Sequence, residues 1–462
     1  MLLHLLLQRI LAFQRMVKSV KKDVVVIGGS AAGVTAAITA RRHYRNASIA
    51  VVRREKEVVV PCGVPYIYGT LKDVRKNLIP DAVLLNRNIE IIVDEVTSIN
   101  RDEKSLTLSK GDKLEYEKLI LAVGSSPVVP PIPGVNLENV FVVRKDVEYL
   151  SRLMAALEKA RDVVIIGGGF IGVEFADEFA KRGLNVTIVE LLPHCLQLAF
   201  DEDYCLMAEQ KLAERGVTLR TNERAEEIIG DGKVEKVKLS SGEALKADLV
   251  LIGIGVKPNT ELAEKADLKI GERKGIWVDK YMRTSDEDIF AVGDCAEKYS
   301  FFTNKPTALR LASISTKEAR IAGANLFSLK RVNIGCIGSF STIIGDLALG
   351  VAGLTERAAR EESFEYITGE FKAPDKHPGS MPNTREMKVK LLFEKGSGIL
   401  IGGQVAGGAT TAEVTNILVS MIEKCMTAEE VATFQFGTHP ALTSSPITYQ
   451  ITEAAEEALT KL

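Results

Sequence analysis

The stretch DVVIIGGGFIGVEFADEFAKRG, at residues 162–183, decides the fold of this chain. A run of β-branched residues leads into a glycine turn, and a segment with helical spacing and small residues on one face follows. That order is typical of the strand, phosphate-binding turn and helix of a mononucleotide-binding unit. Gly167 permits the tight turn, Gly169 lets backbone N–H groups approach a pyrophosphate, and Gly172 lets the helix pack on the strand.

A second copy of the design stands at residues 23–42, where the sequence reads DVVVIGGSAAGVTAAITARR. Gly28 and Gly33 keep the first and last glycine, Ser30 takes the middle place, and Ala31 opens the helix. Serine is small enough for that place. One GxGxxG pattern is weak evidence, but two, each between a strand and a helix, predict two dinucleotide sites.

The residue that ends the next strand of each unit affects which ribose the site can bind. NVTIVE, at residues 185–190, ends in Glu190, whose carboxylate can accept hydrogen bonds from a ribose 2′-hydroxyl and repels a 2′-phosphate. No Arg or Lys follows at once, so NADH is favoured and NADPH stays open. In the first unit SIAVVRRE ends in Arg53 and Arg54, which places Arg53 by the first cofactor and leaves its ribose contact open.

Three further strand-and-glycine-turn stretches are LILAVGSSP at 119–127, LIGIGVKPNT at 251–260 and IFAVGDCAE at 289–297. They put Gly124, Gly255 and Gly293 at strand ends. Asp294, directly after Gly293, could hold a polyol hydroxyl. The alternative is that these are ordinary strand-end turns.

Bulk properties limit the function classes. A chain of 462 residues is too long for one core. Its net charge of −2 gives no reason to expect nucleic acid or an anionic membrane as a partner. Six cysteines are scattered without a CxxC pair or metal-type spacing, which favours a reducing, cytoplasmic location. The apolar start, MLLHLLLQRILAFQR, is too short to cross a bilayer and polar residues interrupt it, so we expect no membrane span.

The motifs GGSAAG, LILAVGSSP, GGGFIGVE, VKPNT and IFAVGDCA occur in an order that resembles the pyridine nucleotide–disulfide oxidoreductases. The resemblance covers roughly residues 20–460. It implies an α/β fold with two Rossmann-like nucleotide-binding domains, one for FAD and one for NAD(P)H, plus an α+β C-terminal dimerisation domain. The expected segments are an N-terminal extension (1–19), the first FAD-binding part (20–126), the NAD(P)H-binding domain (127–258), the second FAD-binding part (259–331) and the dimerisation domain (332–462). A homodimer or a dimer of dimers is implied.

The resemblance also implies roles for the residues at the turns. The expected FAD contacts are Gly28, Ser30, Ala31, Gly33, Arg53, Val96, Gly124, Gly293 and Asp294. Val96 would contact the adenine through its backbone, and Asp294 would hold the ribityl chain. The expected contacts to the nicotinamide dinucleotide are Gly167, Gly169, Gly172, Glu190 and Gly255.

The segment VVVPCGVPYIYG, at residues 58–69, holds a lone cysteine, Cys62. Two-cysteine members of the family use CxxxxC, so Cys62 resembles the single-cysteine branch: coenzyme A-disulfide reductases, NADH-dependent persulfide and polysulfide reductases, NADH oxidases and NADH peroxidases. A lone cysteine beside a flavin needs an outside partner for its oxidised form, which is a thiol, a persulfide sulfur or an oxygen. We expect a helix to start after Cys62, with Pro65 in its first turn, and to lower the thiol pKa. The alternative is a buried, inert cysteine.

Choosing within the branch uses three further residues. Oxidases and peroxidases often carry a histidine in the first glycine turn, and GGSAAG has none. Members that use coenzyme A often carry basic residues on the first helix, where Arg41 and Arg42 could pair with its phosphates; a solvated helix end is the alternative. THPALTSSP faintly resembles the two-cysteine reductases, in which such a histidine donates a proton from the other subunit. His439 is thus a candidate acid, with a surface role as the alternative.

The first hypothesis is an FAD-dependent NAD(P)H oxidoreductase that reduces coenzyme A disulfide, persulfide or polysulfide through Cys62. The second is an NADH oxidase or peroxidase with a Cys62 sulfenic acid. The third is a flavoprotein redox sensor or carrier that binds NADH and signals through a partner.

Overall fold

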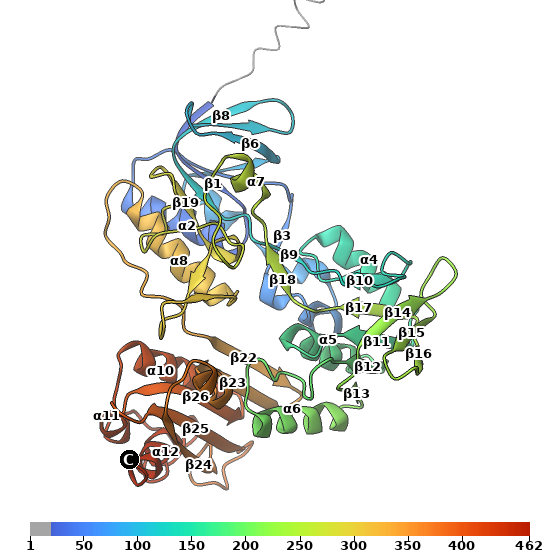
Figure 1. The fold of residues 1–462 in the computed structure, drawn as a ribbon, viewed down its shortest axis with the longest axis vertical. Helices are drawn as coiled ribbons and strands as arrows, with labels where there is room; N and C mark the ends of the chain where they lie inside the picture. The colour runs from blue at the N-terminus through green and yellow to red at the C-terminus, as the bar shows by residue number, and fades with distance from the viewer. Residues whose placement is uncertain (1–19) are drawn as a thin grey trace, which may run out of the picture.

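The first sheet carries the expected strand–turn–helix unit at its centre. A computed structural model describes residues 20–462, and the predicted extension at 1–19 lies outside the described residues. The parallel strands are β1 (Val20–Ile27), β2 (Ile49–Arg53), β5 (Ile89–Val93), β8 (Lys113–Leu121) and β19 (Ile289–Ala291), in the order β5-β2-β1-β8 with β19 on β8. The antiparallel strands β6 (Val96–Asn100) and β7 (Ser105–Leu108) extend it. Helices α2 (Ala31–His43) and α8 (Ala312–Asn325) pack against each other beside this sheet (Figure 1).

The second sheet repeats the arrangement. Its parallel strands run β10 (Val140–Val142), β17 (Leu249–Ile252), β11 (Asp162–Ile166), β12 (Asn185–Val189) and β13 (Thr218–Arg220). Its helices are α4 (Val147–Leu157), α5 (Phe170–Ala180) and α6 (Glu202–Glu214), and β14 (Ala225–Ile229), β15 (Lys236–Leu239) and β16 (Ala244–Lys246) form a small antiparallel sheet beside it. The central strands β1, β11 and β17 carry buried apolar runs, at Val24–Ile27, Val163–Ile166 and Leu249–Ile252, as strands covered on both faces do.

A two-stranded ribbon joins the two sheets. The chain leaves the first through β9 (Ser125–Pro127) and returns through β18 (Val256–Pro258), and these strands pair antiparallel. Short helix α7 (Glu261–Lys265) follows the return. The exact limits of the predicted domains stay a prediction.

The last part of the chain is an antiparallel sheet with helices. The strands, in spatial order, are β22 (Ser339–Ile344), β23 (Leu347–Gly353), β26 (Leu400–Gly407), β25 (Glu386–Glu394) and β24 (Tyr366–Pro374). Helices α10 (Thr411–Glu423) and α12 (Gln450–Leu459) pack on it, α11 (Ala428–Ala432) packs against α12, and α9 (Glu356–Glu361) lies between β23 and β24 in the chain. The predicted α/β fold with an α+β C-terminal domain is confirmed.

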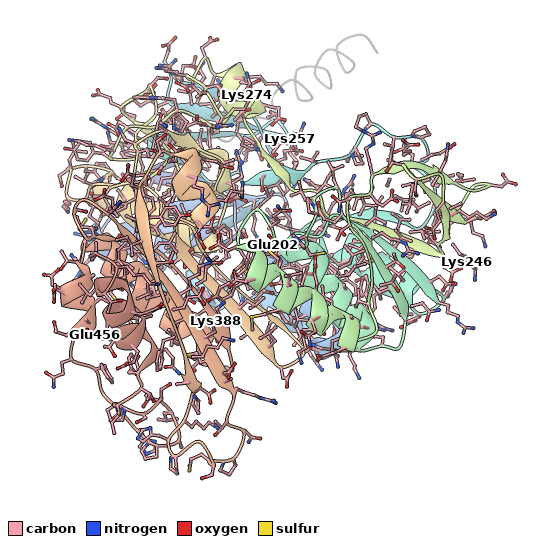
Figure 2. All side chains as sticks on the ribbon, turned by 60° about the horizontal axis from the view of Figure 1, so that its bottom comes forward. Glu202, Lys246, Lys257, Lys274, Lys388 and Glu456 are labelled. Atoms are coloured by element: carbon pink, nitrogen blue, oxygen red, sulfur yellow. The ribbon has the colours of Figure 1, made fainter. Side chains whose placement is uncertain are left out.

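Helix α6, which belongs to the second sheet, also packs against the C-terminal sheet. Figure 2 marks the start of α6 with Glu202 and places Lys388 on β25. Tyr204 donates a hydrogen bond to the backbone oxygen of Gln404 at 3.1 Å, and Lys390 pairs with Asp201 at 3.1 Å. These buried contacts fix the unit around the second sheet to the C-terminal domain. Within residues 20–462, no helix combines the length and apolar character needed to cross a membrane.

Candidate functional site: two glycine turns and an exposed cysteine

The first glycine turn follows β1 and cannot hold side chains. Gly28 has φ +117°, and a Cβ there would lie 2.2 Å from the backbone oxygen of Ala122. A Cβ on Gly33 would lie 1.9 Å from the backbone oxygen of Gly28. Such approaches are possible only for glycine, so these residues bring strand, turn and helix together.

The helix N-terminus after each turn is free for an anion. Ser30 precedes α2 and makes no side-chain cap, and Gly169 precedes α5 with open space where its Cβ would lie. Neither helix has an acidic residue in its first turn, whereas α6 has two. Uncapped N–H groups with a positive helix dipole favour a phosphate. Both turns therefore fit the pyrophosphate of a dinucleotide, with Ala31 in the first turn of α2.

Arg53 lies beside the first turn, but its guanidinium is engaged in an ion pair within the chain. Its terminal nitrogens bind both carboxylate oxygens of Asp81, at 2.7 and 2.8 Å, and the backbone oxygen of Lys56. The aliphatic stem packs against Gly29, where a Cβ would lie 2.6 Å from Cδ of Arg53. The residue is 4% exposed. Arg53 thus lines the turn with its stem, while its ion pair holds the loop around Asp81.

Three strand ends meet at one edge of the first sheet. In the parallel register, Leu121 of β8 lies between Ile27 of β1 and Ala291 of β19. This places Gly124 and Gly293 next to the first turn, at the point where the strand order reverses, which is where open α/β sheets bind ligands. Val96 lies farther out, as the first residue of β6.

Asp294 is held at this edge by hydroxyl groups. The hydroxyl of Ser125 donates to Asp294 at 2.7 Å, that of Ser315 donates at 3.4 Å, and the ammonium of Lys145 lies 3.9 Å away. The side chain keeps some exposure, so its oxygens can reach a polyol chain. The geometry therefore fits the predicted contact with a ribityl group.

Glu190 lies beside the second glycine turn. Gly167 has φ +108°, and a Cβ on Gly172 would lie 1.9 Å from the backbone oxygen of Gly167. Glu190, directly after β12, accepts hydrogen bonds from the backbone N–H of Gly168 at 2.5 Å and of Leu192 at 2.7 Å. Gly255 lies beyond β17 with φ +102°, at the start of the return ribbon.

Cys62 lies on a short exposed turn. It is the middle residue of a 3₁₀ helix, Pro61–Gly63, and is exposed. Asn77 fixes this turn: its backbone oxygen accepts from Val60 N–H at 2.8 Å, and its side-chain amide donates to the Val60 oxygen at 2.9 Å. A Cβ on Gly63 would lie 2.0 Å from Oδ1 of Asn77, so a glycine is needed after the cysteine.

The expected helix after Cys62 is short, and its effect on the thiol is absent. Beyond the 3₁₀ turn that holds Cys62, the chain is next helical over Ile67–Leu71, in π-helical geometry, so this helical segment starts five residues after the cysteine. Desolvation raises the pKa of the Cys62 thiol, the carboxylate of Glu174 raises it further, and Lys145 opposes both. The predicted lowering of this pKa is therefore wrong, because a neighbouring acid and the loss of solvent outweigh the cation.

Glu174 is a site residue that the sequence reasoning missed. It lies on α5, one turn before Glu178, which accepts hydrogen bonds from the backbone N–H groups of Gly69 and Thr70 in the segment after Cys62. Glu174 itself accepts from the hydroxyl of Thr342, on β22, at 3.1 Å. Burial raises its pKa to about 7. The signal was present in GGGFIGVE, whose last residue is this acid.

The two arginines at the end of α2 differ. Arg41 donates to four backbone oxygens, those of Arg45, Ala47, Arg87 and Asn88. Its guanidinium therefore joins the end of α2 to the turn before β5, and a phosphate would have to compete with these bonds. Arg42 is exposed. The predicted coenzyme A contact is thus compatible with Arg42 and disfavoured for Arg41.

His439 lies in an exposed loop of the C-terminal part. Its backbone N–H donates to Thr443 at 3.0 Å, and its Nδ1 accepts from Ala441 N–H at 3.2 Å. The charges of Glu174, Lys145 and Asp294 lie close enough to Cys62 to shift the pKa of its thiol. His439 is not among the groups named for this shift.

Comparison with known families covers most of the chain. Residues 22–319 match the family described as pyridine nucleotide-disulphide oxidoreductase, and residues 339–448 match the dimerisation domain of the same family.

Named relatives and solved structures agree with this match. A Methanocaldococcus jannaschii protein called NADH oxidase is 33% identical over 95% of this chain and 99% of its own length. A Pyrococcus horikoshii NAD(P)H coenzyme A polysulfide/persulfide reductase is 35% identical over 84% of this chain and 88% of its own. The structure of a NAD-dependent persulfide reductase from A. fulgidus superimposes with a TM-score of 0.89 at 33% identity, covering 96% of this chain and 83% of that one.

Proposed function

This chain belongs to the pyridine nucleotide-disulphide oxidoreductase family, and we propose that it uses NAD(P)H and FAD to reduce coenzyme A disulfide, persulfide or polysulfide through Cys62. The observation that carries the proposal is the setting of Cys62. It is exposed on a turn fixed by Asn77, and it lies within electrostatic reach of Asp294 from the first dinucleotide unit and Glu174 from the second. Four of the other cysteines are buried, and Cys425 lies two residues beyond the end of α10 in the C-terminal part.

Each cofactor would be held by the residues described above. The first turn and α2 would bind the FAD pyrophosphate, Asp294 the ribityl chain and Val96 the adenine. The second turn and α5 would bind the nicotinamide dinucleotide, with Glu190 at the ribose and Gly255 alongside. Bound FAD would supply the redox chemistry, in which a hydride is taken from NAD(P)H and an electron pair is delivered to sulfur.

The sulfur chemistry falls to Cys62. Its thiolate attacks an S–S bond of the substrate, so that one S–S bond forms as another breaks, and the leaving sulfur takes up a proton. The two electrons of NAD(P)H then break the new bond, which restores Cys62 and releases the second reduced sulfur. For a disulfide, the sum is NAD(P)H + H⁺ + RSSR → NAD(P)⁺ + 2 RSH.

Glu174 is suited to hold the proton that this reaction consumes. Its pKa of about 7 lets it carry a proton near neutral pH. Its carboxyl is the charged group with the largest effect on the Cys62 thiol, and Thr342 fixes its other side by a hydrogen bond. We assign Arg42 to the phosphates of a coenzyme A substrate, since Arg41 is bound to backbone oxygens.

The assembly and location follow from the same features. The match of residues 339–448 to a dimerisation domain supports a homodimer, in which His439 of one subunit would serve the site of the other. A cytoplasmic location is consistent with six free cysteines.

A steady-state assay with NADH and a panel of acceptors tests the proposal. Coenzyme A disulfide, a persulfide or polysulfide should be reduced faster than hydrogen peroxide or oxygen. Cys62→Ser should abolish turnover with the sulfur acceptors, and Cys425→Ser, which changes the other exposed cysteine, should leave it unchanged. Full activity of Cys62→Ser with every sulfur acceptor would refute the proposal.

An NADH oxidase or peroxidase is the second candidate, and the Methanocaldococcus jannaschii relative of that name favours it. In that case a peroxide would oxidise Cys62 to a sulfenic acid, and two electrons from NADH would return it to the thiol with release of water. Mass spectrometry of the oxidised protein separates the two. A bound coenzyme A or sulfur on Cys62 supports the first candidate, and an added oxygen with rapid peroxide turnover supports the second.

A further inference from the structure

A buried ion pair lies directly beneath the turn that presents Asp294. Lys298, on β20 (Lys298–Tyr299), is 2% exposed, and Glu318, on α8, is 1% exposed. The ammonium of Lys298 lies 2.8 Å from Oε2 of Glu318. Neither is part of the site described above, and the first is 4 residues beyond Asp294 in the sequence.

Both partners of the pair bind the backbone of that turn. The Lys298 ammonium donates to the backbone oxygens of Gly293 at 2.5 Å and Ala296 at 3.0 Å. Oε2 of Glu318 accepts from the backbone N–H of Gly293 at 2.9 Å. The 3₁₀ turn Gly293–Cys295 is therefore gripped at both ends by one ion pair.

Helix α8 reaches Asp294 itself one turn earlier. Ser315, three residues before Glu318, donates to Asp294 at 3.4 Å. Gly293 has φ +77°, and a Cβ there would lie 2.9 Å from Cβ of Ala32. The turn thus sits between the start of α2 and the face of α8 that carries Ser315 and Glu318, so a shift of the pair would move Asp294.

Fold stability alone does not explain such a pair. Burying two charges is expensive, and apolar residues of similar volume in the same place are often as stabilising or more so. Oε1 of Glu318 is buried and has no hydrogen-bond partner among residues 20–462, which adds to the expense. A buried pair with this cost points to a role in holding the local backbone in one orientation.

We propose that Lys298 and Glu318 are positioning residues, whose ion pair holds the Gly293–Asp294 turn in the orientation that Asp294 needs to bind the ribityl chain of FAD. The inference rests on the proposed function, in which Asp294 contacts FAD. It adds that FAD affinity depends on two residues that do not touch the cofactor and act through Asp294.

The test is the FAD affinity of the deflavinated full-length chain, measured by titration with FAD and flavin fluorescence. Lys298→Met/Glu318→Leu should raise the FAD dissociation constant about tenfold or more, and the thermal midpoint of the deflavinated chain measures what losing the bonds to Gly293 and Ala296 costs the fold. Lys118→Met/Asp288→Asn removes another ion pair from the same sheet, away from the turn, and should leave FAD affinity unchanged. An unchanged dissociation constant in the Lys298/Glu318 variant overturns the proposal.

A double-mutant cycle shows whether the pair acts through Asp294. In an Asp294→Ala background, removing the pair should change FAD affinity by less than about twofold. A full additional loss would mean a general structural role and overturn the inference. If Lys298→Met/Glu318→Leu does not fold, Glu318→Gln keeps an acceptor for Gly293 N–H and should weaken FAD binding about threefold in the same cycle.

The outcome also separates this inference from the proposed function. A wild-type chain that binds no FAD would refute the proposed function. FAD binding that Asp294→Ala weakens and the pair variant does not would refute only the role of Lys298 and Glu318.

Discussion

The two glycine turns of this chain have the same backbone and different surroundings. A Cβ on Gly33 would lie 1.9 Å from the oxygen of Gly28, and a Cβ on Gly172 would lie 1.9 Å from the oxygen of Gly167. The helices that follow both lack a side-chain cap and an early acid. The shared part is the part that faces a pyrophosphate, which any dinucleotide carries.

The difference lies at the end of the next strand. Arg53 is buried and bound to Asp81, whereas Glu190 accepts two backbone N–H groups around its own turn and keeps a carboxylate at the ribose position. We propose that the turn provides the dinucleotide site and that the strand-end residue selects the ribose. The predictions below test this separation.

Blocking one turn should remove one cofactor and leave the other. Gly33→Val should yield protein without FAD, because its side chain meets the Gly28 backbone oxygen and overpacking of this kind costs about 1–3 kcal/mol or more. Gly172→Val should bind FAD and fail to oxidise NADH. Flavin absorbance and stopped-flow reduction by NADH measure the two effects. Gly437→Ala, in the C-terminal part and outside both turns, where space for a Cβ is open, is the control.

Removing the acid at the strand end should relax nucleotide choice without affecting FAD. Glu190→Ala removes a charged acceptor worth about 1.5–3 kcal/mol, so KM for NADH should rise tenfold or more and the preference over NADPH should shrink. The ratio of kcat/KM for the two nucleotides measures it. An unchanged ratio would place the selection elsewhere.

Glu174 should make the stability of the second unit depend on pH near neutrality. Its pKa is raised from 4.5 to about 7, so between these values the folded state binds more protons than the unfolded state and stability falls as pH rises. Glu174→Gln should remove this loss, stabilising the chain above pH 7 by about 3 kcal/mol relative to wild type, with little difference at pH 4. Urea unfolding at several pH values measures it.

The same variant should flatten the pH profile of disulfide reduction near neutrality. If the profile keeps its inflection near pH 7 in Glu174→Gln, another group holds the proton.

The neighbouring arginines of α2 should separate substrate binding from folding. Arg42→Ala should raise KM for coenzyme A disulfide a few-fold, consistent with an exposed ion pair worth up to about 1 kcal/mol, with no change in the thermal midpoint. Arg41→Ala should lower the midpoint, because four backbone oxygens lose their donor. Equal effects of the two variants on KM would contradict this division.

Local sequence patterns were enough to predict the two dinucleotide units, and the resemblance to the family supplied FAD as the first cofactor. Glycine spacing and β-branched runs are short-range signals, so Gly28, Gly167 and Glu190 could be placed in advance. The pKa of Cys62 could not, because it depends on Glu174, which is 112 positions away and reaches the thiol only when α5 packs on the cysteine segment. The roles of Arg41 and Arg53 likewise follow from partners distant in sequence, Asn88 and Asp81.

The ribbon of β9 and β18 has a consequence for how this architecture can be rebuilt. Because these strands pair, with Val128 N–H donating to the oxygen of Gly255 at 2.9 Å, the inserted NAD(P)H-type unit begins and ends at nearly one point. A unit with adjoining ends can be cut out, closed by a short loop or exchanged for another without stretching the remainder. Coenzyme preference would move with the exchanged unit, and so would Glu174, so a replacement unit would have to supply an acid at the same place on its helix.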